Sequence, residues 1–305
     1  MTVTQVIAYA KVNLVLAVGR VRPDGYHELG NVFHAVNLAE HVRVEQADAD
    51  SLQFTGPVDA GSLSTGPENL VWRAADTVAE LAGGRPQLRV VVGKHVPIQG
   101  GMAGGSADAA ATLRAVNRLL GHPLSTRHLH EAAARLGADV PFALDGGSAV
   151  GFGRGDVLTR LPHPQLWWVL VFSDRGLSTP EVFRSYDELM AERSGGAPAE
   201  SQPVTVDIDL GAVEQALTSA EPARVASILR NDLTHAAYGL QPRLAQVYDD
   251  GMRAGALAGV VCGSGPTYAF LAASEWDARE LATRMQDRSY QAMVVSSAPA
   301  PYADR

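Results

Sequence analysis

The chain is poor in cysteine, in basic runs and in long apolar stretches. Its 305 residues include one cysteine, Cys262, which excludes an internal disulfide framework and is typical of a reducing compartment. The formal net charge is −8 without any basic run, which argues against nucleic-acid and anionic-membrane partners. No apolar stretch approaches the ~20 residues of a membrane span, and the N-terminus has no signal-peptide pattern. We therefore expect a cytoplasmic protein.

An apolar fraction of 46% and a length that allows two domains predict a globular protein, and the order of the strands and helices given next predicts an α+β architecture. Segments rich in β-branched residues predict strands at 6–18, 36–44, 88–92, 149–161, 166–172, 268–271 and 292–296. Apolar spacing and end signals predict helices at 70–81, 109–120, 125–136 (with Ser125 as N-cap), 210–217, 223–233, 244–254 and 276–285. A Gly/Pro/Ser-rich loop is expected at 194–203. We place the two domains at 1–160 and 161–305.

The most informative segment is a glycine-rich stretch at residues 97–106, the phosphate loop, which runs into an alanine-rich helix. Unpaired N–H groups at a helix start bind anions, and glycine lets a phosphate approach the backbone. On this loop alone, a flexible turn that happens to precede a helix is the alternative. Ser106 and Ala107 stand where a Walker A motif needs Lys and then Ser or Thr, and no GxGxxG can be placed here. A second glycine cluster at 151–155 predicts a turn between strands.

Three further clusters carry reactive or recognition groups. Alternation in a strand puts Lys11 and Asn13 on one face, either in a cleft or on a solvated sheet surface. Pro-Asp-Gly at 23–25 predicts a turn that presents Tyr26 and His27, which could stack on and hydrogen-bond a planar base; alternatively, Tyr26 packs on its own loop. Asp139 follows a helix as either cap or base.

Two local expectations accompany these clusters. Pro141 should push Val140 toward extended geometry, because a proline disfavours the helical region for the residue before it. Lys94 is expected as a surface lysine, although it could reach a bound nucleotide.

In order along the chain, the lysine strand at 8–14, the phosphate loop and the Gly-Ser-Gly-Pro-Thr turn at 263–267 resemble the GHMP kinases. This superfamily is named for galactokinase, homoserine kinase, mevalonate kinase and phosphomevalonate kinase. The resemblance implies a ribosomal-S5-like N-terminal ATP-binding domain and a ferredoxin-like C-terminal domain, with the active site in the cleft between them. Gln99 and Ala103 depart from the pattern, because the family usually has glycine there, and Ala107 replaces a second serine.

Within the superfamily, the 22–29 turn, Asn69-Leu70-Val71 and Gly-Ala-Asp-Val-Pro-Phe at 137–142 are most similar to 4-diphosphocytidyl-2-C-methyl-D-erythritol kinases. The resemblance implies transfer of the ATP γ-phosphoryl group, with Mg²⁺, to a hydroxyl of the cytidine diphosphate-linked methylerythritol. Lys11 and Asp139 would be catalytic, Asp139 as base. ATP would be held by Pro97, Gly100, Gly101, Met102, Ala103, Gly104, Gly105, Ser106 and Ala107. The acceptor would be bound by Asn13, Tyr26, His27, Asn69, Asp139 and Thr179.

Tyr26 would stack on the cytosine of the acceptor, and His27 would hydrogen-bond the edge of that base. Asn13 and Asn69 would contact the erythritol or diphosphate end of the acceptor. Ser106 is the candidate Mg²⁺ ligand. Two alternatives remain: a GHMP kinase that acts on mevalonate or homoserine, and a non-catalytic regulator that binds a ligand on the same scaffold. Because the chain has both Lys11 and Asp139, the residues that catalysis would need, the non-catalytic alternative is disfavoured. The oligomeric state is left open.

Overall fold

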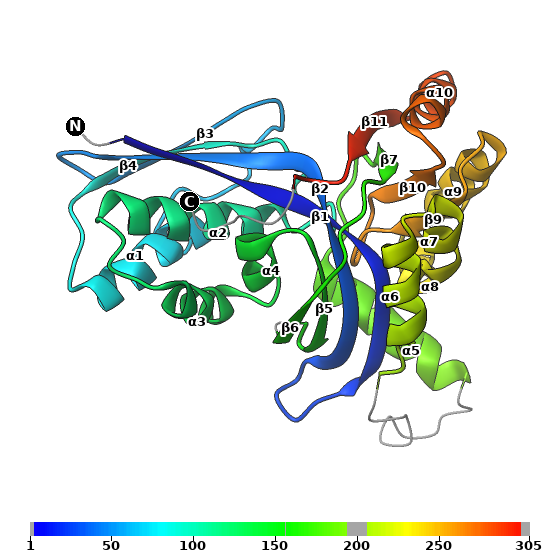
Figure 1. Ribbon diagram of the computed structural model, residues 1–305, viewed down its shortest axis with the longest axis horizontal. Coiled ribbons are helices and arrows are strands. Elements are labelled where there is room, and N and C mark those ends of the chain that lie inside the picture. The colour runs from blue at the N-terminus through cyan, green and yellow to red at the C-terminus, as the bar shows by residue number, and fades with distance from the viewer. Residues whose placement is uncertain (1–2, 156, 194–205, 300–305) are drawn as a thin grey trace.

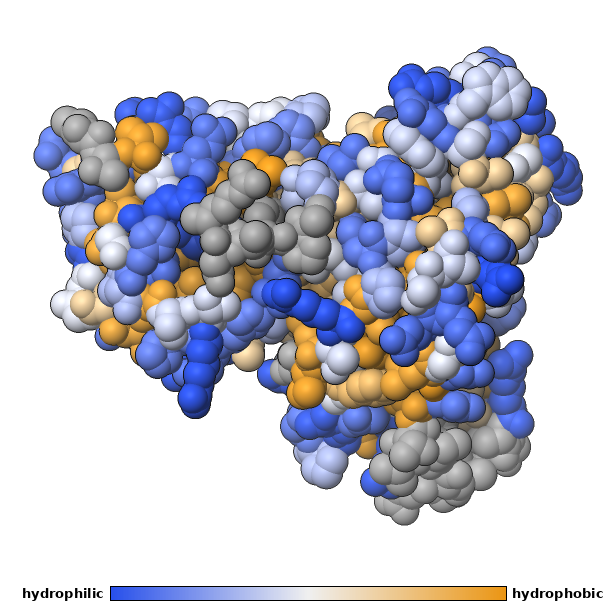
Figure 2. All heavy atoms as spheres, in the orientation of Figure 1, coloured by the Kyte–Doolittle hydropathy of each residue, from blue (hydrophilic) through white to orange (hydrophobic). Residues whose placement is uncertain are grey.

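A computed structural model describes residues 3–155, 157–193 and 206–299, so the predicted loop at 194–203 lies outside the described residues. Two parts lie side by side, each built on one sheet (Figure 1). Hydrophilic residues cover much of the outer surface of both parts, with apolar atoms showing between them near the middle (Figure 2). No helix of the described part is long and apolar enough to cross a membrane.

The first sheet has seven strands in the order β3-β4-β2-β1-β8, with β5 pairing to β2 and β6 to β5. Its strands are β1 (Val3–Val21), β2 (His27–Gln46), β3 (Ser51–Thr55), β4 (Leu88–Gly93), β5 (Ser148–Gly153), β6 (Val157–Leu161) and β8 (Arg230–Asn231). The early part of β2 pairs with β5, so that Leu29 lies opposite Gly153, and the late part pairs with β4. The long β1–β2 ribbon therefore reaches from one part of the molecule to the other (Figure 1).

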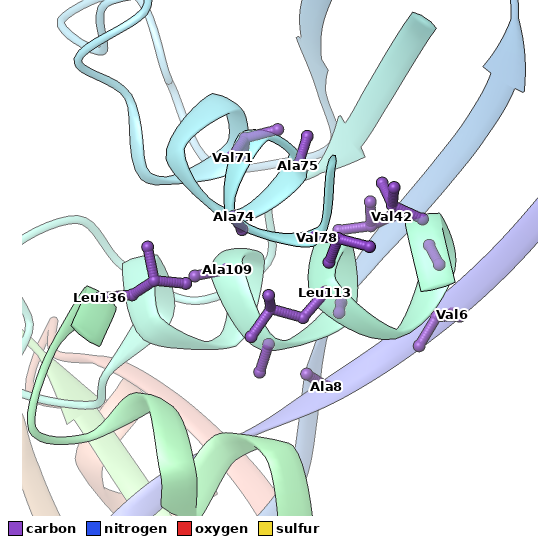
Figure 3. Close-up of a cluster of buried hydrophobic side chains, with 14 of the residues drawn as sticks. Val6, Ala8, Val42, Val71, Ala74, Ala75, Val78, Ala109, Leu113 and Leu136 are labelled. Carbon is purple, nitrogen blue, oxygen red and sulfur yellow. The ribbon is translucent and has the colours of Figure 1, made fainter. Parts of the chain in front are cut away.

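Helix α2 lies at the centre of the first part, between the β1–β2 ribbon and the other helices (Figure 1). The helices here are α1 (Leu70–Ala82), α2 (Gly104–Leu119), α3 (Thr126–Leu136) and α4 (Val140–Asp145). Five of the buried residues of α2 are alanines, at 107, 109–111 and 115, and a helix that is covered on most sides is expected to be rich in apolar residues. Figure 3 shows Ala109 and Leu113 of α2 among side chains of β1, β2, α1 and α3. This packing fixes the helix whose first residues form the end of the phosphate loop.

The second sheet has the order β11-β7-β10-β9. The elements of this part are β7 (Trp167–Phe172), α5 (Thr179–Arg193), α6 (Leu210–Ser219), α7 (Pro222–Ile228), α8 (Thr234–Leu240), α9 (Arg243–Arg253), β9 (Ala258–Val261), β10 (Tyr268–Ala272), α10 (Glu275–Gln286) and β11 (Gln291–Ser296). Alternation along β7 places Trp168 and Leu170 in a cluster with Val12 of β1, and Val169 and Val171 in a cluster with α10. The two parts therefore share a core.

The predicted α+β architecture is confirmed, and so are the Ser125 cap and the turn after β5. Three local predictions are wrong. Helix α2 begins at Gly104, inside the glycine loop, because the unpaired first turn tolerates glycine there. The segment 223–233 divides into α7 and β8. Val140 is helical: Pro141 is accepted in the first turn of α4, where its missing N–H costs no hydrogen bond, and this placement overrides the preference of a residue before proline for extended geometry.

Helices α4, α5 and α8 and strand β3 were not expected from the sequence. The change from the first sheet to the second lies between β6 and β7, although β8 returns to the first sheet. The division into domains at 160 and 161 stays a prediction.

Candidate active site

A pocket of about 620 Å³, the central pocket, lies where the phosphate loop meets β1, α5 and the 263–267 turn. Most of the predicted site residues line it. They are Lys11, Asn13, Asn69, Pro97, Gly100, Gly101, Met102, Ala103, Gly104, Gly105, Ser106, Asp139 and Thr179. Ala107, Tyr26 and His27 are not in its wall. The structure thus brings together the predicted catalytic pair and nearly all of the predicted phosphate contacts.

The phosphate loop presents unpaired backbone donors to this pocket. Residues 104–106 are the first three of α2, and Ala103 precedes them without a side-chain cap hydrogen bond. The N–H groups of a first helical turn have no partner within the helix, and the helix dipole attracts negative charge. Ala107 is the first residue whose N–H is engaged, donating to the Ala103 carbonyl at 2.9 Å, and its side chain is buried. This explains why Ala107 lies outside the pocket.

Two of the three departures from the family loop pattern, Gln99 and Ala103, occupy strained backbone. Gln99 has φ 54° and Ala103 has φ 62°, in the left-handed region that favours glycine. Each such residue costs roughly 1–2 kcal/mol relative to the right-handed conformation. The chain therefore keeps a glycine-like loop shape at positions where it has side chains.

Lys11 is buried and not on a solvated sheet face. Its Nζ donates to Asn13 Oδ1 at 2.6 Å and to the Gly101 carbonyl at 2.7 Å. Asn13 Oδ1 also accepts from the N–H of Gly263 at 2.7 Å, and Asn13 Nδ2 donates to Asn31 Oδ1 at 2.7 Å. Both polar ends of Asn13 are thus engaged by the protein, so Asn13 positions the ammonium. Among the described residues, no ion pair joins Lys11 to Asp139.

Asp139 occupies the N-cap position of α4 without serving as its cap. Its backbone has φ −85° and ψ −8°, and its side chain makes no capping hydrogen bond. The carboxylate is half-buried and lines the central pocket instead. A carboxylate that faces a pocket and does not bond its own helix can accept a proton from a bound hydroxyl. The cap alternative is therefore wrong.

Two other predicted residues line the pocket with engaged polar groups. Thr179 Oγ1 and Ser264 Oγ lie 2.9 Å apart, which joins α5 to the 263–267 turn. Asn69 is the cap of α1: its Oδ1 accepts from the N–H of Val71 at 2.9 Å, and its Nδ2 donates to the Ser64 carbonyl at 2.6 Å. Asn69 therefore holds the loop before α1, and this does not favour its predicted contact with the acceptor.

Tyr26 and His27 take opposite orientations. The side chain of Tyr26 is 60% exposed, and the guanidinium carbon of Arg154 lies 5.8 Å from its ring centroid. The Nδ1 of His27 bonds the Gly19 carbonyl at 2.9 Å, and its Nε2 lies 3.4 Å from Asp187 Oδ1.

Two residues that the sequence analysis did not assign connect this corner to the pocket. His27 stacks on Phe183, with ring centroids 4.9 Å apart, and both Phe183 and Arg154 line the central pocket. Phe183 follows the predicted Thr179 by one helical turn, and Arg154 lies inside the glycine cluster at 151–155. Neither position carries a local pattern that would have identified it.

Lys94 is buried and lines the pocket, so the expectation of a surface lysine is wrong. Its Nζ bonds Glu40 Oε1 at 2.5 Å and Asp108 Oδ2 at 2.7 Å. Burial raises the pKa of Asp108 to about 7; the charge of Lys94 opposes this rise and that of Glu40 adds to it. The second oxygen of Asp108 is buried without a partner among the described residues.

Comparison with known proteins defines the family. The GHMP kinases N terminal domain matches residues 69–147, and the GHMP kinases C terminal domain matches residues 209–291. The chain is 48% identical to 4-diphosphocytidyl-2-C-methyl-D-erythritol kinase of Mycolicibacterium smegmatis, over 90% of this chain and 83% of that protein. The chain belongs to the 4-diphosphocytidyl-2-C-methyl-D-erythritol kinase family. The Mycobacterium tuberculosis H37Rv kinase of the same name is 45% identical over 96% of this chain and 90% of that protein.

Solved structures agree with this placement among the 4-diphosphocytidyl-2-C-methyl-D-erythritol kinases. A crystal structure of a 4-(cytidine 5′-diphospho)-2C-methyl-D-erythritol kinase has a TM-score of 0.77 and 32% identity, covering 96% of this chain and 99% of the other. Homoserine kinase of Cytophaga hutchinsonii has a TM-score of 0.72 at 18% identity, covering 99% and 96%, which shows a shared fold. The predicted GHMP-kinase fold is confirmed.

Proposed function

We propose that this chain transfers the γ-phosphoryl group of ATP to a hydroxyl of 4-diphosphocytidyl-2-C-methyl-D-erythritol and releases ADP. One observation carries the proposal: a single pocket is lined by the first turn of α2 with its unpaired N–H groups, by the buried Lys11, and by Asp139, whose carboxylate makes no capping hydrogen bond to α4. A phosphate site, a fixed cation and a proton acceptor are the parts that phosphoryl transfer requires. The names and high identity of the relatives support the choice of acceptor.

The donor binds through the backbone. The N–H groups of residues 104–106 hold the phosphates at the start of α2, where the helix dipole stabilises their charge. Gly101 keeps the loop against the 263–267 turn, because a side chain at its Cα would collide with the Cys262 carbonyl oxygen. The phosphate loop is thus a preformed cradle whose shape the second part of the molecule helps to fix.

Chemistry takes place between Asp139 and Lys11. Asp139 accepts the proton of the acceptor hydroxyl, whose oxygen forms a bond to the γ-phosphorus as the bond from that phosphorus to the ADP oxygen breaks. Lys11 is held by Asn13 and the Gly101 carbonyl, so its charge is in place before the reaction begins. Fixed charge of this kind stabilises the oxygens of the transferring group more than mobile water does.

The residues present fit a magnesium ion that arrives with ATP. Mg²⁺ usually takes one or two protein ligands together with phosphate oxygens and waters. The described residues contain no group of three or more His, Cys, Asp or Glu that could hold a metal, so a dedicated protein cage is not formed there. The Ser106 hydroxyl, at the start of α2 and in the pocket wall, would hold the ion. When bound, Mg²⁺ neutralises phosphate charge.

The acceptor lies across the β1–β2 turn. We place cytosine against the exposed ring of Tyr26, and the methylerythritol near Thr179 and Asp139. His27 binds the cytosine edge only by exchanging one of its present partners, Gly19 or Asp187. His27 also stacks on Phe183, which lines the pocket, so His27 lies beside the end of the pocket where we place the cytosine.

The test is ADP release by the purified chain with ATP and Mg²⁺, measured with 4-diphosphocytidyl-2-C-methyl-D-erythritol, mevalonate and homoserine in parallel. We expect turnover with the cytidylated alcohol alone. Turnover confined to mevalonate or homoserine would replace the acceptor and keep the kinase. Binding of ATP without turnover of any of the three would favour the non-catalytic alternative.

A further inference from the structure

We infer that Gln99 is a positioning residue, which holds the phosphate loop against the segment between β7 and α5 and so fixes the ATP phosphates relative to the acceptor side of the central pocket. The inference rests on the proposed function and assigns a role to a side chain that stands where the family usually has glycine. It follows from a contact between the two parts of the molecule, from the backbone at Gln99 and from the residues that the contacted segment carries.

Gln99 packs directly on Gly176, which lies between β7 and α5. A Cβ added at Gly176 would lie 2.8 Å from Gln99 Oε1 and 2.9 Å from Gln99 Cβ, which is closer than real Cβ atoms come to their neighbours. The backbone of Gly176 lies outside the left-handed region, so its own conformation does not require glycine. The second part of the molecule therefore has room for Gln99 because residue 176 has no side chain.

The side chain of Gln99 is kept at a strained position. Its φ of 54° is one that glycine adopts freely and other residues rarely do. Such strain persists only where the surrounding structure holds it, and it is concentrated at ligand-binding and catalytic sites. Gln99 also lines the central pocket. A glycine at this position would remove the strain and, with it, the contact to Gly176.

The contact gives the phosphate loop a second attachment to the second part of the molecule. The first attachment is at the 263–267 turn, where a Cβ on Gly100 would lie 3.0 Å from Thr267 Oγ1. A loop that is attached at one segment can still pivot about it. Attachment at Gly176 as well restricts this rotation, so the backbone donors at the start of α2 hold the phosphates in one place.

The contacted segment leads directly into the acceptor side of the pocket. Helix α5 begins at Thr179, three residues after Gly176, and both Thr179 and Phe183 line the pocket. Leu177 is buried, which anchors the segment between the contact and the helix. The Gln99 contact therefore sets the distance between the phosphate loop and the wall formed by α5. Phosphoryl transfer depends on this distance, because a displacement of about 1 Å can slow an enzymatic reaction about 10²-fold.

A contact that only adds to packing predicts a different set of results. It would change the melting temperature and leave the transfer rate of a folded, saturated enzyme unchanged. A positioning contact instead makes the transfer rate depend on the steric fit between residues 99 and 176. Each of the two residues can be replaced separately, so this fit can be both tightened and relieved.

The experiment measures single-turnover phosphoryl transfer to 4-diphosphocytidyl-2-C-methyl-D-erythritol by the full chain at saturating ATP, with ATP affinity measured separately by calorimetry. Gly176→Ala pushes one carbon against Gln99, and we expect the transfer rate to fall about 10-fold or more. Gln99→Gly loses the attachment and should be slower than the wild type by about fivefold or more, within the range of coupling between residues in contact.

The decisive comparison is Gly176→Ala made in three chains: the wild type, Gln99→Ala and Gln99→Gly. In Gln99→Gly the nearest remaining atom is the carbonyl oxygen of residue 99, at 3.6 Å, so Gly176→Ala should lower the rate of that chain by less than about twofold. Gln99→Ala keeps the Cβ and the positive φ, so the effect of Gly176→Ala there should be intermediate. ATP affinity should follow the same pattern.

Gly239→Ala is the matched control. Gly239 lies in α8, and a Cβ there would meet Ser185 Oγ of α5 at 3.7 Å, which is an ordinary contact. This variant adds the same carbon against the same helix without displacing the phosphate loop, so it should transfer phosphate at the wild-type rate.

A wild-type transfer rate in a folded Gly176→Ala or Gln99→Gly variant would overturn the inference and leave the proposed function intact. Equal losses from Gly176→Ala in the wild type and in Gln99→Gly would also overturn it. Absence of transfer by the wild-type chain would overturn the proposed function instead. The ATP affinities of the same variants would then decide the inference, because Gly176→Ala should weaken ATP binding only where residue 99 has a side chain.

Discussion

The side-chain oxygen of Asn13 accepts a hydrogen bond at 2.7 Å from the backbone N–H of Gly263, 250 residues further along the chain. The same oxygen accepts from the Lys11 ammonium at 2.6 Å. One atom therefore joins the first strand, the 263–267 turn and the proposed catalytic lysine. The position of the ammonium thus depends on the correct docking of the two parts of the molecule.

Replacing Asn13 with alanine should misplace Lys11 and leave the buried N–H of Gly263 without a partner. We expect kcat to fall by about 10²-fold or more, in the range for loss of a preorganised electrostatic contact. A buried unpaired donor should also cost about 1–3 kcal/mol of stability. Asn13→Asp keeps oxygen acceptors for both donors and should retain more activity. Equal kcat values for the two variants would contradict this role.

Gly101 should not tolerate a side chain. A Cβ there would come within 1.8 Å of the Cys262 carbonyl oxygen, and the residue has φ 74°. We expect Gly101→Ala to weaken ATP binding and to lower the melting temperature, because the loop must leave the 263–267 turn. Gly121→Ala is the control: Gly121 has φ 82° with nothing within 4 Å of the added carbon, so it isolates backbone strain. Similar ATP affinities for the two variants would argue against the docking contact.

Ala103 should be replaceable by glycine but not by valine. Glycine relieves the left-handed strain while adding freedom to the unfolded chain, so Ala103→Gly should change stability by less than about 1 kcal/mol. A β-branched residue strongly disfavours positive φ, so Ala103→Val should distort the cradle and raise the KM for ATP. The measurement is the ATP KM of both variants. Wild-type kinetics in Ala103→Val would show that the loop does not need this conformation.

The interaction between His130 and Asp145 should make the free energy of unfolding depend on pH. Their Nε2 and Oδ1 atoms lie 2.9 Å apart, and the hydrogen bond that His130 donates to the Asp145 carboxylate raises the pKa of His130. Burial works to raise the pKa of Asp145, but the bond and charge of His130 and the charge of Arg160 outweigh it, and that pKa is lowered. The raised pKa of the histidine means that the pair stabilises the folded state fully at pH values below about 6.5, and this stabilisation is lost as the pH rises. The lowered pKa of the aspartate means that the stabilisation is present at pH values above about 3.9 and is lost as the pH falls.

The pair should therefore contribute most between these limits, by less than about 1 kcal/mol because His130 is partly exposed. Urea unfolding at pH 5.5 and pH 8.5 tests this for His130→Ala. We expect a larger loss of unfolding free energy at pH 5.5. A loss of the same size at both pH values would refute the linkage.

Local patterns in the sequence identify features that short segments determine. Ser125 caps α3 because its hydroxyl accepts from an N–H three residues on, which spacing alone indicates. The burial of Lys94 was not predictable in this way, because its partners come from β2 and α2, which only the folded chain brings together. The helical conformation of Val140 was not predicted, because the preference of a residue before proline for extended geometry is only a tendency, and the first turn of α4 overrides it.

The acceptor end shows the same limit. Tyr26 and His27 are sequence neighbours and were predicted to act together, yet one is exposed and the other is buried against Phe183 of α5. Their separation depends on where β2 begins and on a helix some 150 residues later. Lys11 and Asp139, in contrast, were placed together by resemblance to the family, and they line one pocket.

The most direct test of the account is Asp139→Asn, measured by single-turnover phosphoryl transfer to 4-diphosphocytidyl-2-C-methyl-D-erythritol with ATP binding measured separately. Asparagine keeps the size of the side chain and cannot accept the hydroxyl proton. The account predicts a rate about 10²–10⁴-fold lower, the range for loss of a general base, with ATP affinity within a few-fold of the wild type. A near-normal rate of transfer in this variant would contradict it.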